Sequence, residues 1–201
     1  MKILTTKEKK QITLFLEELL IGSYISKIEW RYSRFDFYLK RDEKKEFMGA
    51  ELSSEVYCAT PFTGEIEFLN DDNYKKLSKE LVIEKLDTDW PTNAPIFYKL
   101  TELSLKKVKV ISIKLKFYFL EIAFEDKSTF HINTKGCVDD GLGLMDKDEK
   151  FTSYGFWSLG NAKIWSFYFG AGEYFLESPM TKEVIKGYWD DSFKDENWCK
   201  P

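Results

Sequence analysis

His131 is the only histidine in the 201-residue chain, so a catalytic triad, a cysteine–histidine pair or a multi-histidine metal site would have to use it. Cys137, Asp139 and Asp140 follow it closely, and these residue types occur in nucleophilic and metal chemistry. The alternation of polar and apolar residues puts His131 on the polar side of a strand, whereas the other three fall in a glycine-rich loop. We interpret the group as an exposed histidine beside an unrelated acidic loop, and we expect no catalytic residue there.

The cysteines and glycines indicate no metal or cofactor. Cys58, Cys137 and Cys199 are an odd number without a CxxC pair, which predicts free thiols rather than a disulfide framework or a zinc site. Gly141-Leu142-Gly143 is not continued as GxGxxG, and GxxxxGK[ST] occurs nowhere in the chain, so nucleotide binding is not expected. We predict no cofactor and no metal ligand.

Carboxylates leave one enzymatic alternative open. Asp146, Asp148 and Glu149 could gather around a calcium ion, but the glycine and bidentate glutamate of a calcium loop are missing at the proper spacing. A solvated acidic loop explains them better. A hydrolase that works with two carboxylates needs no histidine, as in glycosidases. The sequence therefore favours a protein that is not an enzyme, with a carboxylate-dependent hydrolase as an alternative.

Residues 107–135 carry the clearest structural pattern. Apolar residues alternate with lysine, serine and glutamate, and the parity of the alternation changes near residues 117–119, which predicts a turn or bulge there. A second, polar break falls at residues 125–128. We predict a three-stranded antiparallel meander with one apolar face. The side chains expected to be buried are Ile113, Leu115, Leu120, Ile122 and Phe124.

The N-terminal part of the chain follows the same plan. Thr5 or Thr6 can cap a helix that has Glu8 in its first turn, and Gly22 can end it. Alternating strands follow, the third over about residues 47–58. The side chains expected to be buried here are Ile28, Trp30, Phe35 and Phe37.

These two patterns overlay at an offset of 84 to 85 residues, which predicts a tandem duplication of a helix-plus-meander unit. The first unit, with a connecting helix, would span residues 1–90 and the second residues 91–201, and the two could pack as one domain. An aromatic hairpin should follow residue 155, with its turn at Leu159-Gly160-Asn161. Ser178 and Pro179 then predict a short helix that Gly187 ends. The expected fold class is α+β, rich in antiparallel sheet.

Charge and composition narrow the class of partner. The chain has 43% hydrophobic and 32% charged residues and a net charge of −4, which describes a globular protein without global electrostatic support for nucleic-acid binding. We read the lysines of residues 106–116 as a solvated sheet face. Residues 136–201 carry 12 acidic and 7 basic side chains. No signal peptide or apolar run long enough for a membrane is evident, so we expect a cytoplasmic protein.

Aromatic residues interleave with the acidic residues of this C-terminal part, as in a surface that binds a basic protein. We therefore expect a binding protein that neutralises a protein partner, with a bacterial immunity protein against a cognate toxin as the leading hypothesis. A phage-encoded inhibitor of a bacterial defence nuclease is the close alternative. The residues expected to contact the partner are Asp139, Asp140, Asp146, Asp148 and Glu149, with Trp157 or Trp189 as an anchor.

Overall fold

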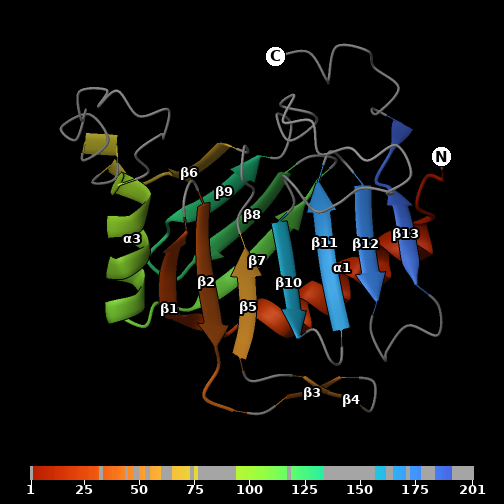
Figure 1. Ribbon diagram of the computed structural model, residues 1–201, viewed down its shortest axis with the longest axis horizontal. Coiled ribbons are helices and arrows are strands. Elements are labelled where there is room, and N and C mark those ends of the chain that lie inside the picture. Colours follow the sequence, from red (N-terminus) through yellow and green to blue (C-terminus); the bar gives the residue numbers. More distant parts are fainter. Residues whose placement is uncertain are drawn as a thin grey trace.

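The chain is an α+β protein in which helices accompany antiparallel sheets, as the computed structural model shows (Figure 1). The fold class expected from the sequence is confirmed. The structure describes residues 2–31, 34–43, 45–47, 50–52, 55–59, 65–72, 75–76, 94–116, 119–133, 157–161, 165–170, 173–177 and 184–191.

The strands form two main sheets. The large sheet has the order β1-β2-β5-β10-β11-β12-β13, the small sheet has the order β6-β9-β8-β7, and β3 pairs with β4 in a separate hairpin. The large sheet consists of β1 Tyr24–Arg31, β2 Arg34–Lys40, β5 Glu55–Ala59, β10 Trp157–Asn161, β11 Trp165–Gly170, β12 Glu173–Glu177 and β13 Ile185–Tyr188. The remaining strands are β3 Lys45–Phe47, β4 Ala50–Leu52, β6 Glu65–Leu69, β7 Val110–Leu115, β8 Phe119–Phe124 and β9 Thr129–Asn133.

Helix α1 (Thr6–Leu20) begins as the sequence predicts. The Thr5 side chain accepts a hydrogen bond from the backbone N–H of Glu8, and the Glu8 carboxylate accepts one from the backbone N–H of Thr5 at 2.8 Å, which makes a capping box. The helix ends at Ile21, and Gly22 follows with a φ of 85° that suits glycine. Its buried face consists of Ile12, Phe15, Leu16, Leu19 and Leu20.

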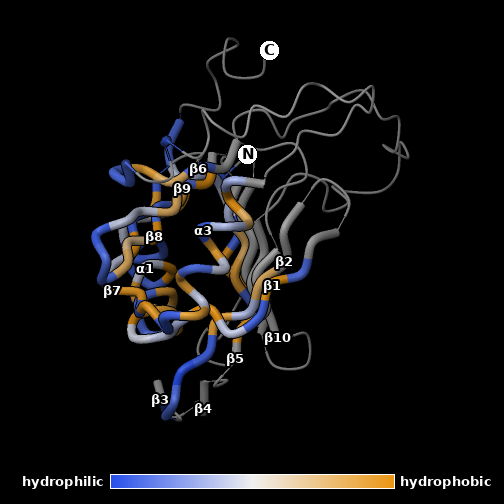
Figure 2. The backbone as a smooth tube through the Cα atoms, turned by 90° about the vertical axis from the view of Figure 1, so that its left-hand side faces the viewer, coloured by the Kyte–Doolittle hydropathy of each residue, from blue (hydrophilic) through white to orange (hydrophobic). Residues whose placement is uncertain are grey.

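The two sheets lie in different layers, with α1 beside the small sheet and α3 (Ala94–Leu105) at one side (Figure 2). Helix α1 packs against β7, whereas α3 packs against β1 and β6. Aromatic rings join the layers, because Phe37 of the large sheet meets Phe130 of the small sheet edge to face at 5.9 Å between ring centroids. Both predicted units therefore contribute to one hydrophobic core.

The two units share strand order and register. In each, the first two strands form an antiparallel pair with one register shift, between Ile25 and Lys27 in the first and between Val110 and Ser112 in the second. These positions lie 85 residues apart. Each helix also has a residue with positive φ just beyond its end, Gly22 at 85° and Lys107 at 49°. The agreement is what a duplication would produce, although a common origin stays a prediction.

The units meet where their first strands begin. The backbone N–H of Gly22 donates to the carbonyl of Val110 at 2.9 Å, and the N–H of Val110 donates to the carbonyl of Ser23 at 2.8 Å. Tyr24 and Lys109 form an antiparallel bridge beside them, and these two residues are themselves 85 positions apart. Matching points of the two units thus contact each other.

Three local expectations were wrong. The chain over residues 47–58 is not one strand, because β3 and β4 form a hairpin before β5. Leu159-Gly160-Asn161 lies inside β10, which pairs with β11, so the aromatic hairpin has its turn later in the chain. Gly187 lies in β13 and does not end a helix; residues 178–183 lie outside the described part. Gly187 is needed there for another reason, since a Cβ would come within 2.7 Å of the Lys2 carbonyl oxygen.

The expected burial is confirmed at the centre of each meander. Leu120, Ile122, Phe124 and Phe37 are at most 1% exposed. Ile28, Ile113 and Leu115 are only partly buried and pack around the core. The side chains of Trp30 and Phe35 lie outside the described part, as does most of the connecting helix expected at residues 74–86.

Candidate binding surface

Four polar side chains lie in one row across the outer face of the small sheet. The row is Lys114 of β7, Glu121 of β8, His131 of β9 and Glu67 of β6, and each is the direct cross-strand neighbour of the next. The alternation of side chains that buries Ile122 and Phe130 turns these four to the other face. We call them the polar row.

Charges of opposite sign are paired along the polar row. The ammonium of Lys114 lies 3.2 Å from a Glu121 oxygen, and Nδ1 of His131 lies 3.4 Å from a Glu67 oxygen. The ring of Phe119 meets the His131 ring at 5.2 Å, and the Lys116 ammonium lies 5.1 Å from the Phe119 centroid. His131 is therefore packed rather than fully exposed, with 17% of its side chain accessible.

The His131–Glu67 pair has the residue types of a general base, but its setting is open to water. The side chains of Lys114 and Glu67 at the two ends of the row are 56% and 54% exposed. A general base works on a substrate held in a fixed pose, usually in a concave site that excludes water. An ordered, mixed-charge sheet face with a central aromatic ring suits contact with another macromolecule better.

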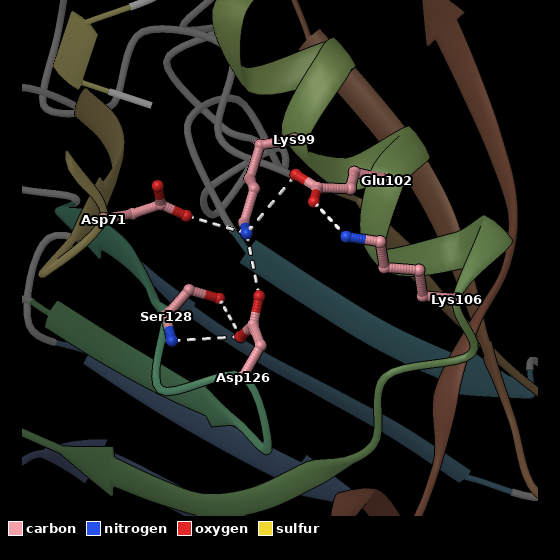
Figure 3. Close-up of polar contacts among 6 residues, drawn as sticks. All are labelled: Asp71, Lys99, Glu102, Lys106, Asp126 and Ser128. Carbon is pink, nitrogen blue, oxygen red and sulfur yellow. Dashed lines mark hydrogen bonds and ion pairs between the residues drawn. The ribbon is translucent and has the colours of Figure 1, made fainter. Parts of the chain in front are cut away.

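A second cluster of charged groups surrounds Lys99 on α3 (Figure 3). Its ammonium lies 2.7 Å from Asp71, which follows β6, and 2.8 Å from Asp126, in the turn between β8 and β9. Glu102, one turn along α3, is 3.6 Å away and is paired with Lys106 at 2.5 Å. The side chain of Lys99 is only 8% exposed, so this cluster fastens α3 to two segments of the small sheet.

The cluster keeps Lys99 charged. Burial alone would lower the pKa of Lys99, but hydrogen bonds and the charges of Asp126 and Asp71 outweigh burial, so its pKa is raised. Burial opposes ionisation of Asp126 too, yet the hydrogen bonds from Lys99 and Ser128 lower its pKa overall. A nucleophilic lysine needs a lowered pKa. The chemistry of this cluster is therefore that of a structural ion pair.

The residues expected to contact a partner are only partly open to inspection. Asp139, Asp140, Asp146, Asp148 and Glu149 lie outside the described residues. Trp157 begins β10, but its side chain also lies outside them. The Trp189 ring is half-buried against Tyr174, with centroids 5.0 Å apart, and the Lys9 ammonium lies 5.5 Å from it. Part of this ring is thus already used to pack the chain against itself.

Two buried cations were missed by the sequence interpretation. Lys99 stands at an inward position of an apolar helix face, between Ile96 and Leu103, and that placement was a usable signal. Arg41 lies in a charged segment where its type predicts exposure, yet it is 7% exposed. Only the packing of distant segments buries it.

Broader comparisons place no further constraint on the site. Within the described residues, no group of three or more histidine, cysteine or acidic side chains is arranged to hold a metal ion. No helix among them combines the length and apolar character needed to cross a bilayer. The chain matches no known family model, no curated protein and no solved structure.

Proposed function

We propose that this chain is a non-enzymatic binding protein that neutralises a basic protein partner in the cytoplasm, as a bacterial immunity protein neutralises its toxin. The observation that carries the proposal is the uneven charge of the sequence, with 12 acidic against 7 basic side chains in residues 136–201 and aromatic residues between them. Toxins that act on nucleic acid present positive surface to it, and an acidic protein can occupy that surface.

Two features of the described residues support a binding role. Asp190 and Asp191 directly follow the edge strand β13 beside the half-buried Trp189, so acidic and aromatic groups are neighbours at this end of the large sheet. The polar row adds a second surface, on which fixed ion pairs surround the Phe119 ring. Aromatic groups within a polar surround are the composition of protein interfaces.

The proposed mechanism is occlusion. Acidic side chains speed the encounter with a basic partner by long-range attraction, and aromatic side chains then lengthen the lifetime of the complex. A phage-encoded inhibitor of a defence nuclease would work by the same contacts and would differ only in its target. The test therefore identifies the partner as well as the contact.

Capture from lysate of the native host, at low and then at raised salt, is the first experiment. The captured partner must be basic and must lose its own activity when the chain is added in equal amount. The double variant Asp139→Lys/Asp140→Lys should weaken capture at least tenfold. Glu43→Lys/Asp72→Lys is the matched control, since it makes the same change of charge at two other exposed positions and should capture nearly as well.

Three results would contradict the proposal. The captured partner could keep its activity in the complex. Capture could be indifferent to salt and to both charge reversals. The isolated protein could also turn over a small molecule, which would favour the carboxylate-dependent hydrolase instead.

A further inference from the structure

A cleft of about 340 Å³ opens where the end of α1 meets the connection between β2 and β3. Its walls come from three separate segments of the chain, so it is formed only in the folded protein. The residues that line it are Ile21, Gly22, Arg41, Asp42, Glu43, Lys45 and Lys109. Three of these side chains are cationic and two are acidic.

Arg41 is the unusual member of this cleft. The residue is 7% exposed, and both terminal nitrogens of its guanidinium are buried without a hydrogen-bond acceptor among the described residues. Burial lowers the pKa of Arg41, and the charge of Glu18 opposes that effect. A buried cation without a partner is strongly unfavourable, because it has given up its hydration for nothing.

The chain's own carboxylates near Arg41 are engaged elsewhere. Glu18 is paired with Lys45 at 2.7 Å, and Asp42 accepts a hydrogen bond from the Tyr24 hydroxyl at 3.3 Å. The matching position of the second unit, 85 residues later, is Asp126, whose charge is satisfied by Lys99 and Ser128. The first unit thus leaves unpaired, beside a cleft, a charge that the second unit pairs internally.

We propose that this cleft binds a carboxylate group of a small molecule, with Arg41 as its principal contact. The planar guanidinium matches a carboxylate with two parallel hydrogen bonds. Lys109, which is exposed at the rim, adds a second positive charge. A singly charged group fits the cleft better than a phosphate dianion, because Asp42 and Glu43 would repel the second negative charge. Binding turns the covered guanidinium nitrogens of Arg41 into the cleft.

Nuclear magnetic resonance titration tests the site with acetate, and with inorganic phosphate as the competing oxyanion. Ionic strength is held constant with sodium chloride, because nonspecific screening would otherwise shift signals everywhere. The backbone amides of Gly22 and Asp42 report on the cleft. In the wild type they should shift saturably with acetate and more weakly with phosphate.

Variants separate this site from general anion attraction. Arg41→Met should raise the acetate dissociation constant at least tenfold, and Arg41→Lys, which keeps the charge without the fork, should raise it several-fold. Lys109→Met removes an exposed rim charge, leaves the core untouched and should also weaken binding. The control Lys186→Met removes an exposed lysine from β13 and should bind acetate like the wild type.

Two outcomes would overturn the proposal. Shifts that never saturate, or that persist unchanged in Arg41→Met and Lys109→Met, would mean that no site exists in the cleft. Phosphate binding more tightly than acetate, in a manner that depends on Arg41, would overturn the assignment to a carboxylate.

Discussion

Arg41 and Asp126 occupy matching places in the two units, directly after the second strand of each meander, and they are treated in opposite ways. Asp126 accepts hydrogen bonds from the Ser128 backbone N–H at 3.0 Å and the Ser128 hydroxyl at 2.6 Å, and it pairs with Lys99. Arg41 has no hydrogen-bond acceptor for its terminal nitrogens among the described residues. At the helix position 84 residues before Lys99, the first unit has Phe15, which is buried in the core.

The comparison teaches that one backbone plan can hold a charge for two purposes. In the second unit a lysine replaces an apolar residue on the helix, and two carboxylates from the sheet neutralise it. In the first unit the helix stays apolar and the turn carries the charge alone. The second arrangement stabilises the fold, whereas the first leaves a cation available to a ligand. The predictions below separate these roles.

The largest effects should come from the core that both units share. Ile122→Ala should lower the free energy of unfolding by about 2–5 kcal/mol, and Phe37→Ala, at the matching position of the first unit, by about 3–5 kcal/mol. Both side chains are at most 1% exposed. Urea denaturation measures the change. Ile111→Ala is the control, since that side chain is 50% exposed and should change stability by no more than about 0.5 kcal/mol.

Removing the buried lysine should have the next largest effect. Lys99→Met keeps the length of the side chain but leaves Asp71 and Asp126 without their cation, which should cost about 3 kcal/mol. The exposed pair of Lys106 and Glu102 supplies the control, and Lys106→Met should cost no more than about 0.5 kcal/mol because Lys106 is 65% exposed. Equal losses in the two variants would show that burial does not strengthen the Lys99 cluster.

The same cluster should make stability depend on pH in acid. The pKa of Asp126 is lowered in the folded protein, so its contribution is complete above the unfolded value of about 3.9 and is lost as pH falls through the folded pKa. Asp126→Asn should therefore be less stable than the wild type at neutral pH, and the difference should shrink below about pH 4. Urea denaturation between neutral pH and strong acid measures it; a constant difference would contradict the assignment.

The sequence predicted those elements whose local pattern and tertiary role agree. Strict alternation and short polar breaks predicted β7, β8 and β9, and the Thr5 cap with Glu8 predicted the start of α1. Ser178 and Gly187 misled the interpretation because helix-capping residue types also suit other contexts. Gly187 is in fact an opening through which residues 2–4 approach β13, where Leu4 donates to the Tyr188 carbonyl at 2.8 Å.

The polar arrangements could not be predicted in the same way. The polar row depends on which strands become neighbours, and β6 joins β9 from more than sixty positions away in the chain. The Lys99 cluster likewise gathers Asp71, Lys99 and Asp126 from three distant segments. A sequence pattern shows which face a side chain takes, but it does not show what will lie opposite.

The smallest expected change tests the contrast between the units most directly. Arg41→Met removes the buried cation that has no partner, so in buffer free of carboxylates the free energy of unfolding should stay unchanged or rise by about 1 kcal/mol. The measurement is urea denaturation of Arg41→Met beside Lys99→Met, on the same day and in the same buffer. The expected result is a clear loss for Lys99→Met and none for Arg41→Met. A loss of about 2 kcal/mol or more for Arg41→Met would mean that Arg41, like Asp126, is paired within the fold, and the contrast would be wrong.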